Sequence, residues 1–98
     1  MKIIKTQNAA ALNVAVEGSL NTTTAPELEA ELKTSLDSVS ELVLDFAKLD
    51  YISSAGLRVL LSAHKVMAKK GGMKVIHVNE SVMEIFEVTG FSDILDIE

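Results

Sequence analysis

The distribution of apolar and polar positions along the chain predicts four strands. Residues 11–18, ALNVAVEG, alternate apolar and polar side chains over part of their length, as a half-buried strand does, and Gly18 ends the run. A weaker strand precedes it in residues 2–6, KIIKT. Residues 41–46, ELVLDF, form a nearly continuous apolar run, which is typical of a parallel strand buried on both faces. Residues 73–78, MKVIHV, indicate the fourth strand.

Helical periodicity fills the segments between these strands. Residues 21–36, NTTTAPELEAELKTSL, carry a helix start signal at Thr24 or Ala25, with Pro26 in the first turn. A longer helix begins near Ser54 and ends at the Gly71–Gly72 pair. Its apolar positions recur every three or four residues, at Leu57, Leu60, Leu61, His64 and Met67. Residues 79–90 predict a third helix, capped by Asn79 or Ser81 and ended by Gly90, while the tail 91–98 is too short to assign.

Strands that alternate with helices through short connections imply an α/β fold, with right-handed crossovers where the strands are parallel. The 98 residues are enough for one domain with a single core, so we expect residues 1–98 to form that domain. With 48% apolar and 23% charged residues, the composition is that of an ordinary globular protein.

Charge and composition narrow the classes of partner. The net charge of −5 argues against nucleic acid, because binding phosphate needs a clustered basic surface and only residues 65–70, KVMAKK, are locally basic. We interpret that cluster as a solvated helix end, where cations complement the helix dipole. No apolar run approaches the roughly 20 residues that span a bilayer, and the apolar stretch in the first ten residues is too short for a signal peptide. We therefore expect a cytoplasmic protein without membrane insertion. Cysteine is absent, which excludes disulfides and thiolate metal ligands.

Familiar catalytic and metal-binding patterns are missing. The chain has no P-loop motif, and His64 and His77 lie on different elements without metal-ligand spacing. A hydrolase would need GxSxG around its serine, and no such motif surrounds Ser54. A phosphoacceptor role for Asp45 would need an acidic cluster for a divalent cation, and the first loop supplies only Glu17. We therefore expect no enzyme activity, no metal and no cofactor.

The segment KLDYISSAGLRVLL, residues 48–61, places Ser53 and Ser54 where an apolar run gives way to a helical pattern. A serine at a helix N-terminus can accept a hydrogen bond from a free backbone N–H, which is worth roughly 1 kcal/mol. The same free N–H groups and the positive end of the dipole would also favour a phosphoserine. Phosphorylation would add about −1.5 to −2 charges without melting the helix, and would change the surface while preserving the fold.

Residues 42–91, LVLDFAKLDYISSAGLRVLLSAHKVMAKKGGMKVIHVNESVMEIFEVTGF, resemble the central and C-terminal body of a STAS domain, as found in bacterial anti-sigma factor antagonists. Residues 14–32, VAVEGSLNTTTAPELEAEL, are similar to the first strand, the Gly-x-Leu-Asp loop and the first helix of that family. The resemblance covers essentially the whole chain. It implies a single STAS domain, with a mixed sheet of four to five strands and helices packed on it.

The resemblance also implies a function. In these antagonists the turn commonly reads Asp-Ser-x-Gly, and its serine is phosphorylated by a partner that is both anti-sigma factor and serine kinase. By position, Ser54 matches the phosphoacceptor, Ala55 the variable residue and Gly56 the glycine. Ser53 and Asn21 stand where many members have aspartate, so both differences remove negative charge beside the site. The unphosphorylated form binds the kinase and releases the sigma factor, and a PP2C-like phosphatase reverses the modification.

We expect the partner surface to surround Ser54, because connections after parallel strands gather at one edge of the sheet. Arg58 follows Ser54 by one helical turn, where it could pair with a phosphate. Leu57 could add an apolar contact. The alternative function is a STAS subunit of a transport or scaffold complex, in which Ser54 only caps the helix. The predicted partner-binding residues are Asn21, Thr22, Thr23, Thr24, Ser53, Ala55, Gly56, Leu57 and Arg58.

Overall fold

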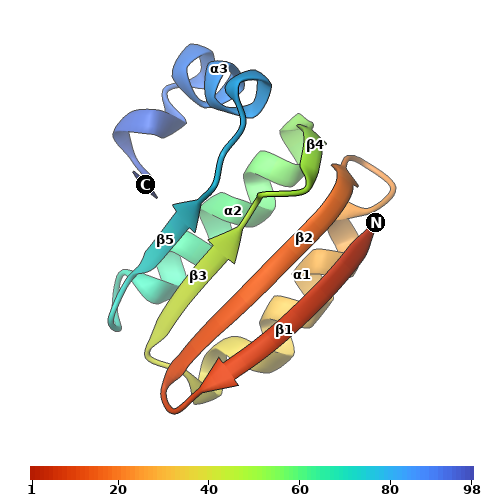
Figure 1. Ribbon diagram of the computed structural model, residues 1–98. Helices are drawn as coiled ribbons and strands as arrows, with labels where there is room; N and C mark the ends of the chain where they lie inside the picture. Colours follow the sequence, from red (N-terminus) through yellow and green to blue (C-terminus); the bar gives the residue numbers. More distant parts are fainter.

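A six-stranded mixed sheet forms the centre of the computed structural model, which describes residues 1–98 (Figure 1). The strand order is β1-β2-β3-β5-β6, and β4 pairs with β2 beside this path. The α/β class predicted from the alternation of elements is confirmed. The strands are β1 (Lys2–Asn8), β2 (Ala11–Leu20), β3 (Glu41–Asp45), β4 (Leu49–Ile52), β5 (Met73–Ile76) and β6 (Asp96–Ile97).

The long strand β2 organises the sheet. It pairs antiparallel with β1 through a tight hairpin and parallel with both β3 and β4. The first half of β2 pairs with β3 and its last three residues with β4, with an irregularity in register at Gly18 and Ser19. Because β3 and β4 follow each other along the same side of β2, the chain leaves the sheet at Ile52, level with the end of β2.

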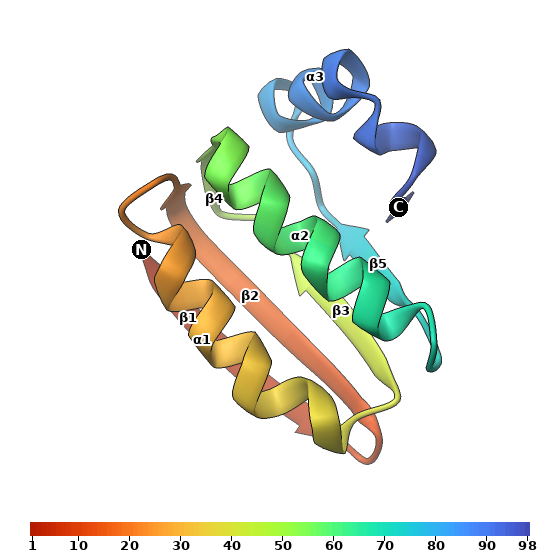
Figure 2. The same ribbon diagram turned by 180° about the vertical axis from the view of Figure 1, so that it is seen from behind.

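Helices α1 (Ala25–Ser35) and α2 (Ser54–Met67) lie side by side on one face of the sheet (Figure 2). Short 3-10 turns follow α1 at Leu36–Ser38 and α3 at Phe91–Asp93. Helix α3 (Glu80–Thr89) lies at the end of the sheet and packs against β4. Its N-cap residue, Asn79, donates a hydrogen bond from Nδ2 to the Leu49 carbonyl at 2.7 Å. No helix is both long enough and apolar enough to cross a membrane.

The buried core is entirely apolar; it lies between the sheet and the helices α1 and α2, and extends to the inner side of α3. Strand β2 contributes Leu12, Val14 and Val16 to it, which are alternate positions on the helix-covered face. The opposite face of the sheet carries no helix (Figure 1). The expectation that residues 41–46 are buried on both faces is therefore wrong: Leu42 and Leu44 are buried, but Val43 and Asp45 on the other face are only partly so.

The apolar and polar pattern did not predict the short strands β4 and β6. The sheet therefore has six strands, where four to five were expected. Strand β4 has only four residues, and its two buried positions stand at its ends rather than alternating. Strand β6 has two residues. The segment 73–78 is a strand only as far as Ile76, because His77 adopts a left-handed conformation with φ of 58°.

The basic segment 65–70 is also more than a solvated helix end. The Lys70 ammonium donates hydrogen bonds to the carbonyl oxygens of Leu36 and Val39, the latter at 3.0 Å. These carbonyls belong to the turn that follows α1. Lys70 therefore fastens the C-terminal end of α2 to the C-terminal end of α1.

Candidate functional site

Ser53 is the N-cap residue of α2. Its backbone is extended, with φ of −98° and ψ of 176°, and its N–H donates to the Leu20 carbonyl at 2.8 Å, which ties the turn to the end of β2. Its hydroxyl oxygen accepts a hydrogen bond from the Gly56 N–H at 3.4 Å. The Ser53 hydroxyl is therefore occupied by the helix that it begins.

Ser54 is the first residue of α2, and it is exposed. Its hydroxyl makes no hydrogen bond within the chain, in contrast to the hydroxyl of Ser53. The first turn of the helix contains no acidic residue. The Ser54 hydroxyl thus faces solvent beside free backbone N–H groups and the positive end of a helix dipole, where a phosphate is electrostatically favoured.

Gly56 and Leu57 hold the helix against the sheet. A Cβ at Gly56 would lie 2.8 Å from side-chain carbons of both Ile52 and Leu20, so only glycine allows this close approach. Leu57 is 6% exposed and belongs to the core. Both positions are buried, so a contact of these two residues with a partner would have to be made through the backbone and the shape of the turn.

The loop between β2 and α1 is held by its own side chains. Asn21 Oδ1 accepts hydrogen bonds from the N–H groups of Thr23 and Thr24, at 2.9 and 3.1 Å. Thr24 Oγ1 donates to the Ser19 carbonyl at 2.7 Å and accepts from the Asn21 N–H at 2.8 Å. Thr22 and Thr23 are exposed at the tip. Asn21 and Thr24 thus set the loop conformation, and Thr22 and Thr23 offer the free surface.

The loop and the serine turn meet at a shallow hollow between the N-terminal turns of α1 and α2. Thr22 lines it from the loop, and Ala55 and Arg58 line it from α2. Arg58 is exposed and has no ion pair within the chain. Its guanidinium is therefore free to meet an anion one helical turn beyond Ser54. The full lining is Thr22, Ala25, Pro26, Glu29, Ala55, Arg58 and Val59.

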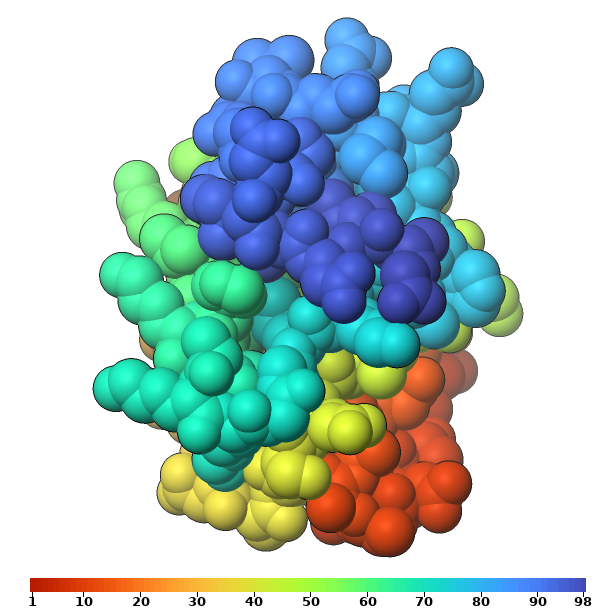
Figure 3. Space-filling view, turned by 90° about the vertical axis from the view of Figure 1, so that its left-hand side faces the viewer, coloured from red at the N-terminus to blue at the C-terminus, as the bar shows by residue number.

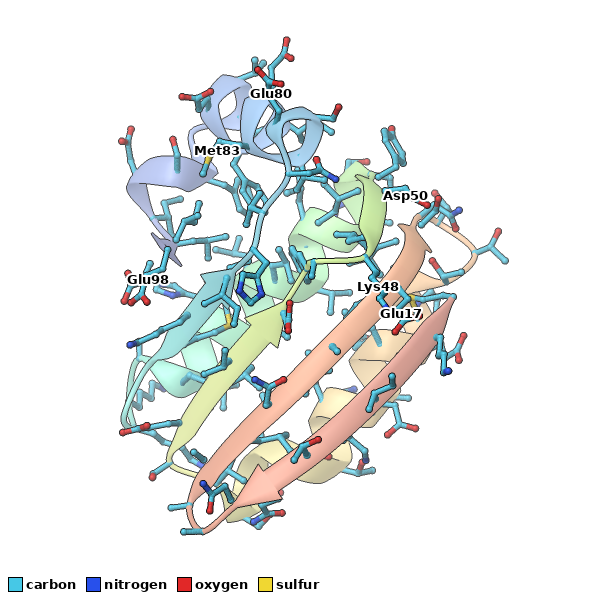
Figure 4. The ribbon with its side chains drawn as sticks, in the orientation of Figure 1. Glu17, Lys48, Asp50, Glu80, Met83 and Glu98 are labelled. Atoms are coloured by element: carbon cyan, nitrogen blue, oxygen red, sulfur yellow. The ribbon has the colours of Figure 1, made fainter.

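Strand β4 adds two exposed residues that sequence reasoning missed. Asp50 and Tyr51 precede the serine turn, and Tyr51 is 51% exposed. Figure 4 shows Asp50 near the end of β2, at the same end of the molecule as Glu80 of α3. An exposed tyrosine beside the turn is a common component of protein interfaces. Little in the sequence indicates that Tyr51 is exposed beside the turn, because the apolar and polar pattern does not identify β4 as a strand.

Asp45 and His77 form a separate polar contact on the uncovered face of the sheet. Asp45 Oδ1 lies 2.9 Å from His77 Nδ1 and also accepts from the Ala47 N–H at 3.0 Å. Partial burial acts to raise the pKa of Asp45, but the hydrogen bonds from His77 and Ala47 together outweigh it and hold that pKa below its ordinary value of 3.8. Glu17 lies 3.9 Å from Lys48 in an ion pair. Asp45 thus serves as a strand-end residue that orders the turn after β3, and no three acidic or histidine side chains in the structure gather closely enough to hold a metal ion.

Known proteins match this chain over nearly its whole length. The STAS domain family model matches residues 2–98. The chain is 37% identical over 99 residues to BtrV of Bordetella bronchiseptica, named as a candidate anti-sigma factor antagonist, and the match covers 99% of this chain and 85% of BtrV. It is 29% identical over 92 residues to the anti-sigma-B factor antagonist of Bacillus subtilis, covering 93% of this chain and 84% of that protein.

The fold is also found among solved structures. An anti-sigma factor antagonist from Mycobacterium paratuberculosis superposes with a TM-score of 0.87 at 23% identity. That superposition covers 98% of this chain and 83% of the other. Both the sequence match and the fold extend over nearly the full length of the chain. The chain therefore belongs to the STAS domain family.

Proposed function

We propose that this chain is an anti-sigma factor antagonist whose binding to an anti-sigma factor is switched off by phosphorylation of Ser54. The observation that carries the proposal is the exposed Ser54 hydroxyl, which makes no hydrogen bond within the chain at the first position of α2. The names of the sequence relatives support the antagonist role. In this proposal the anti-sigma factor is also the serine kinase, and a PP2C-like phosphatase restores the binding form.

The hydrogen bonds of the turn favour Ser54 over Ser53 as the phosphoacceptor. The Ser53 hydroxyl oxygen accepts from the Gly56 N–H, and Ser53 is only partly exposed. Phosphorylating it would require the loss or rearrangement of the helix cap. Ser54 can accept a phosphate without breaking any hydrogen bond in the structure. In this proposal the Ser53 hydroxyl caps the helix and the Ser54 hydroxyl is modified.

The proposed switch works through charge. A phosphate at Ser54 would add about −1.5 to −2 charges to a surface formed by Thr22, Thr23, Ala55 and Arg58. The dipole of α2 and the guanidinium of Arg58 would stabilise the dianion within the chain. A partner site that accommodates the bare hydroxyl would then face an added charge and its hydration shell. Binding is lost although the domain stays folded.

The phosphoacceptor is tested by incubating the purified chain with ATP and an anti-sigma factor serine kinase, followed by intact-mass analysis and fragment mapping. We expect one phosphoryl group on Ser54 in the wild type and in Ser53→Ala, and none in Ser54→Ala. Phosphate on Ser53 would contradict the assignment. A chain that stays unmodified in its native cells under all growth conditions, bound in a stable complex, would favour a transport or scaffold subunit instead.

A further inference from the structure

The negative charge of the chain is concentrated at its C-terminal end. Residues 78–98 contain six acidic residues and no lysine, arginine or histidine. Residues 1–77 hold the other eight acidic residues and all nine lysine and arginine residues, for a net charge of +1. The net charge of −5 therefore arises entirely from the segment that forms α3, the following turn and β6. The six acidic residues are Glu80, Glu84, Glu87, Asp93, Asp96 and Glu98.

The acidic residues of α3 are not neutralised within the chain. Glu98 lies 3.2 Å from Lys74, and this is the only ion pair that the segment makes. Glu80, Glu84 and Glu87 are exposed and have no basic partner. In Figure 3 the atoms of this segment, in blue, form one continuous surface at one end of the molecule. The outer face of α3 thus presents uncompensated negative charge to an approaching molecule.

An apolar contact lies within this acidic surface. Val88 is 81% exposed, the most exposed large apolar side chain in the structure. It shares a shallow hollow with Ile85, one helical turn before it, and Glu84 lines the same hollow. Val82 and Phe86 bury the other side of α3 in the core. The helix thus buries one side in the core and carries a smaller apolar patch, Ile85 and Val88, on its outer face. Glu84 lines the same hollow and Glu87 precedes Val88 in the chain, and we call these two carboxylates the acidic rim.

The α3 surface lies close to the serine turn. Asn79, the N-cap of α3, is hydrogen-bonded to the carbonyl of Leu49, and Leu49 precedes Ser54 by five residues. Five residues of chain span at most about 18 Å. A standard protein interface covers roughly 800 Å² on each partner, which is roughly 30 Å across. One partner can therefore contact the Ser54 turn and the N-terminal end of α3 together, across the exposed residues Asp50 and Tyr51. Val88 lies nine residues beyond Asn79, about 14 Å further along the same helix.

We propose that the outer face of α3 is a second docking surface for the anti-sigma factor, and that this factor presents basic side chains around a small apolar contact there. This inference rests on the proposed function. The charge of this surface indicates which kind of partner can bind it. Nucleic acid would be repelled by the acidic rim. A second copy of the chain joined through a two-fold axis would bring two acidic α3 faces together. A basic protein surface can form ion pairs with the acidic rim and an apolar contact with Val88.

The test uses the purified anti-sigma factor as probe and measures its association rate and affinity at low and moderate salt. The variant Glu84→Lys/Glu87→Lys reverses the rim, and Val88→Ser removes the apolar contact. We expect the double reversal to slow association by about tenfold at low salt and to flatten its salt dependence, because rim charges act chiefly on encounter. Val88→Ser should weaken affinity severalfold through faster dissociation.

Matched controls lie away from α3. Asp37→Lys/Glu41→Lys makes the same charge change at the turn after α1 and the start of β3, and Val66→Ser removes another exposed valine, on α2. Both should leave association unchanged. If the α3 variants bind like the wild type while Ser54→Asp abolishes binding, the α3 proposal is overturned and the Ser54 switch stands. If Ser54→Asp binds like the wild type, or the wild type does not bind at all, the proposed function itself fails.

Discussion

The two adjacent serines have the same chemistry but different surroundings. The Ser53 hydroxyl accepts a hydrogen bond from the third residue of α2, whereas Ser54 makes no side-chain hydrogen bond. Two positions after Ser54, Gly56 fits between Leu20 and Ile52 with no room for a Cβ. Ser53 and Gly56 thus fix the geometry of the turn, and Ser54, the exposed one of the two residues between them, can gain charge without disturbing it.

This division of roles predicts opposite behaviour of the two serines in stability measurements. Ser53→Ala removes the cap of α2 and should lower the free energy of unfolding by about 1 kcal/mol. Ser54→Ala removes an exposed hydroxyl without a partner and should change that free energy by less than about 0.5 kcal/mol. Urea denaturation of both variants beside the wild type provides the measurement. Equal losses for the two variants would show that the cap is shared.

At the scale of elements, the ends of α1 and α2 are joined by one side chain. Lys70 follows α2 and donates to the carbonyls of Leu36 and Val39, which follow α1. The contact joins residues 34 and 31 positions apart in sequence, respectively. It fixes the C-terminal ends of both helices, while their N-terminal turns are left to form the hollow beside Ser54.

We predict that Lys70→Met lowers the free energy of unfolding by about 1–2 kcal/mol, because two carbonyls lose a charged donor. Lys69→Met removes the same charge from an exposed neighbour that makes no such contact, and should be nearly neutral. Thermal unfolding of the two variants under identical conditions distinguishes the contact from net charge. If both variants have the melting temperature of the wild type, the Lys70 contact contributes nothing to stability.

The elements that the sequence predicted are those with enough positions to show a period. Helix α2 repeats its apolar residues over four turns, and β2 alternates over its middle. Strand β4 could not be predicted, since its exposed pair Asp50 and Tyr51 breaks the alternation. The position of Ser54 at the start of α2 was predictable from local signals. The hydrogen bonding that distinguishes the Ser53 hydroxyl from that of Ser54, and the burial of Leu57, depend on how α2 packs against β2 and the core.

At the scale of the whole molecule, the sheet has one covered and one open face, and its charge is uneven. The open face carries the contact between Asp45 and His77, which joins the ends of β3 and β5. The acidic residues of α3 lie at the end where the serine turn also lies. The periodicity of the sequence predicts neither the contact between Asp45 and His77 nor the proximity of α3 to the serine turn. Both arise from the order of strands in the sheet.

The lowered pKa of Asp45 predicts a pH dependence of global stability. Since the folded-state pKa is below the ordinary value of 3.8, ionised Asp45 stabilises the fold above that value, and the contribution is lost as pH falls through the lowered pKa. Wild type should therefore be more stable than Asp45→Ala at about pH 6, and the difference should shrink toward about pH 2. Denaturant titrations across this range test it. A difference that grows as pH falls would contradict the direction of the shift.

The most direct test of the Ser54 switch compares the affinity of the anti-sigma factor for the unmodified chain and for the chain phosphorylated at Ser54, by isothermal titration calorimetry. Ser62→Asp, which adds a charge elsewhere on the exposed side of α2, serves as the control and should bind like the unmodified chain. We predict that the phosphorylated chain binds at least about thirtyfold more weakly, equivalent to roughly 2 kcal/mol. Equal affinity of the two forms would contradict a switch at Ser54.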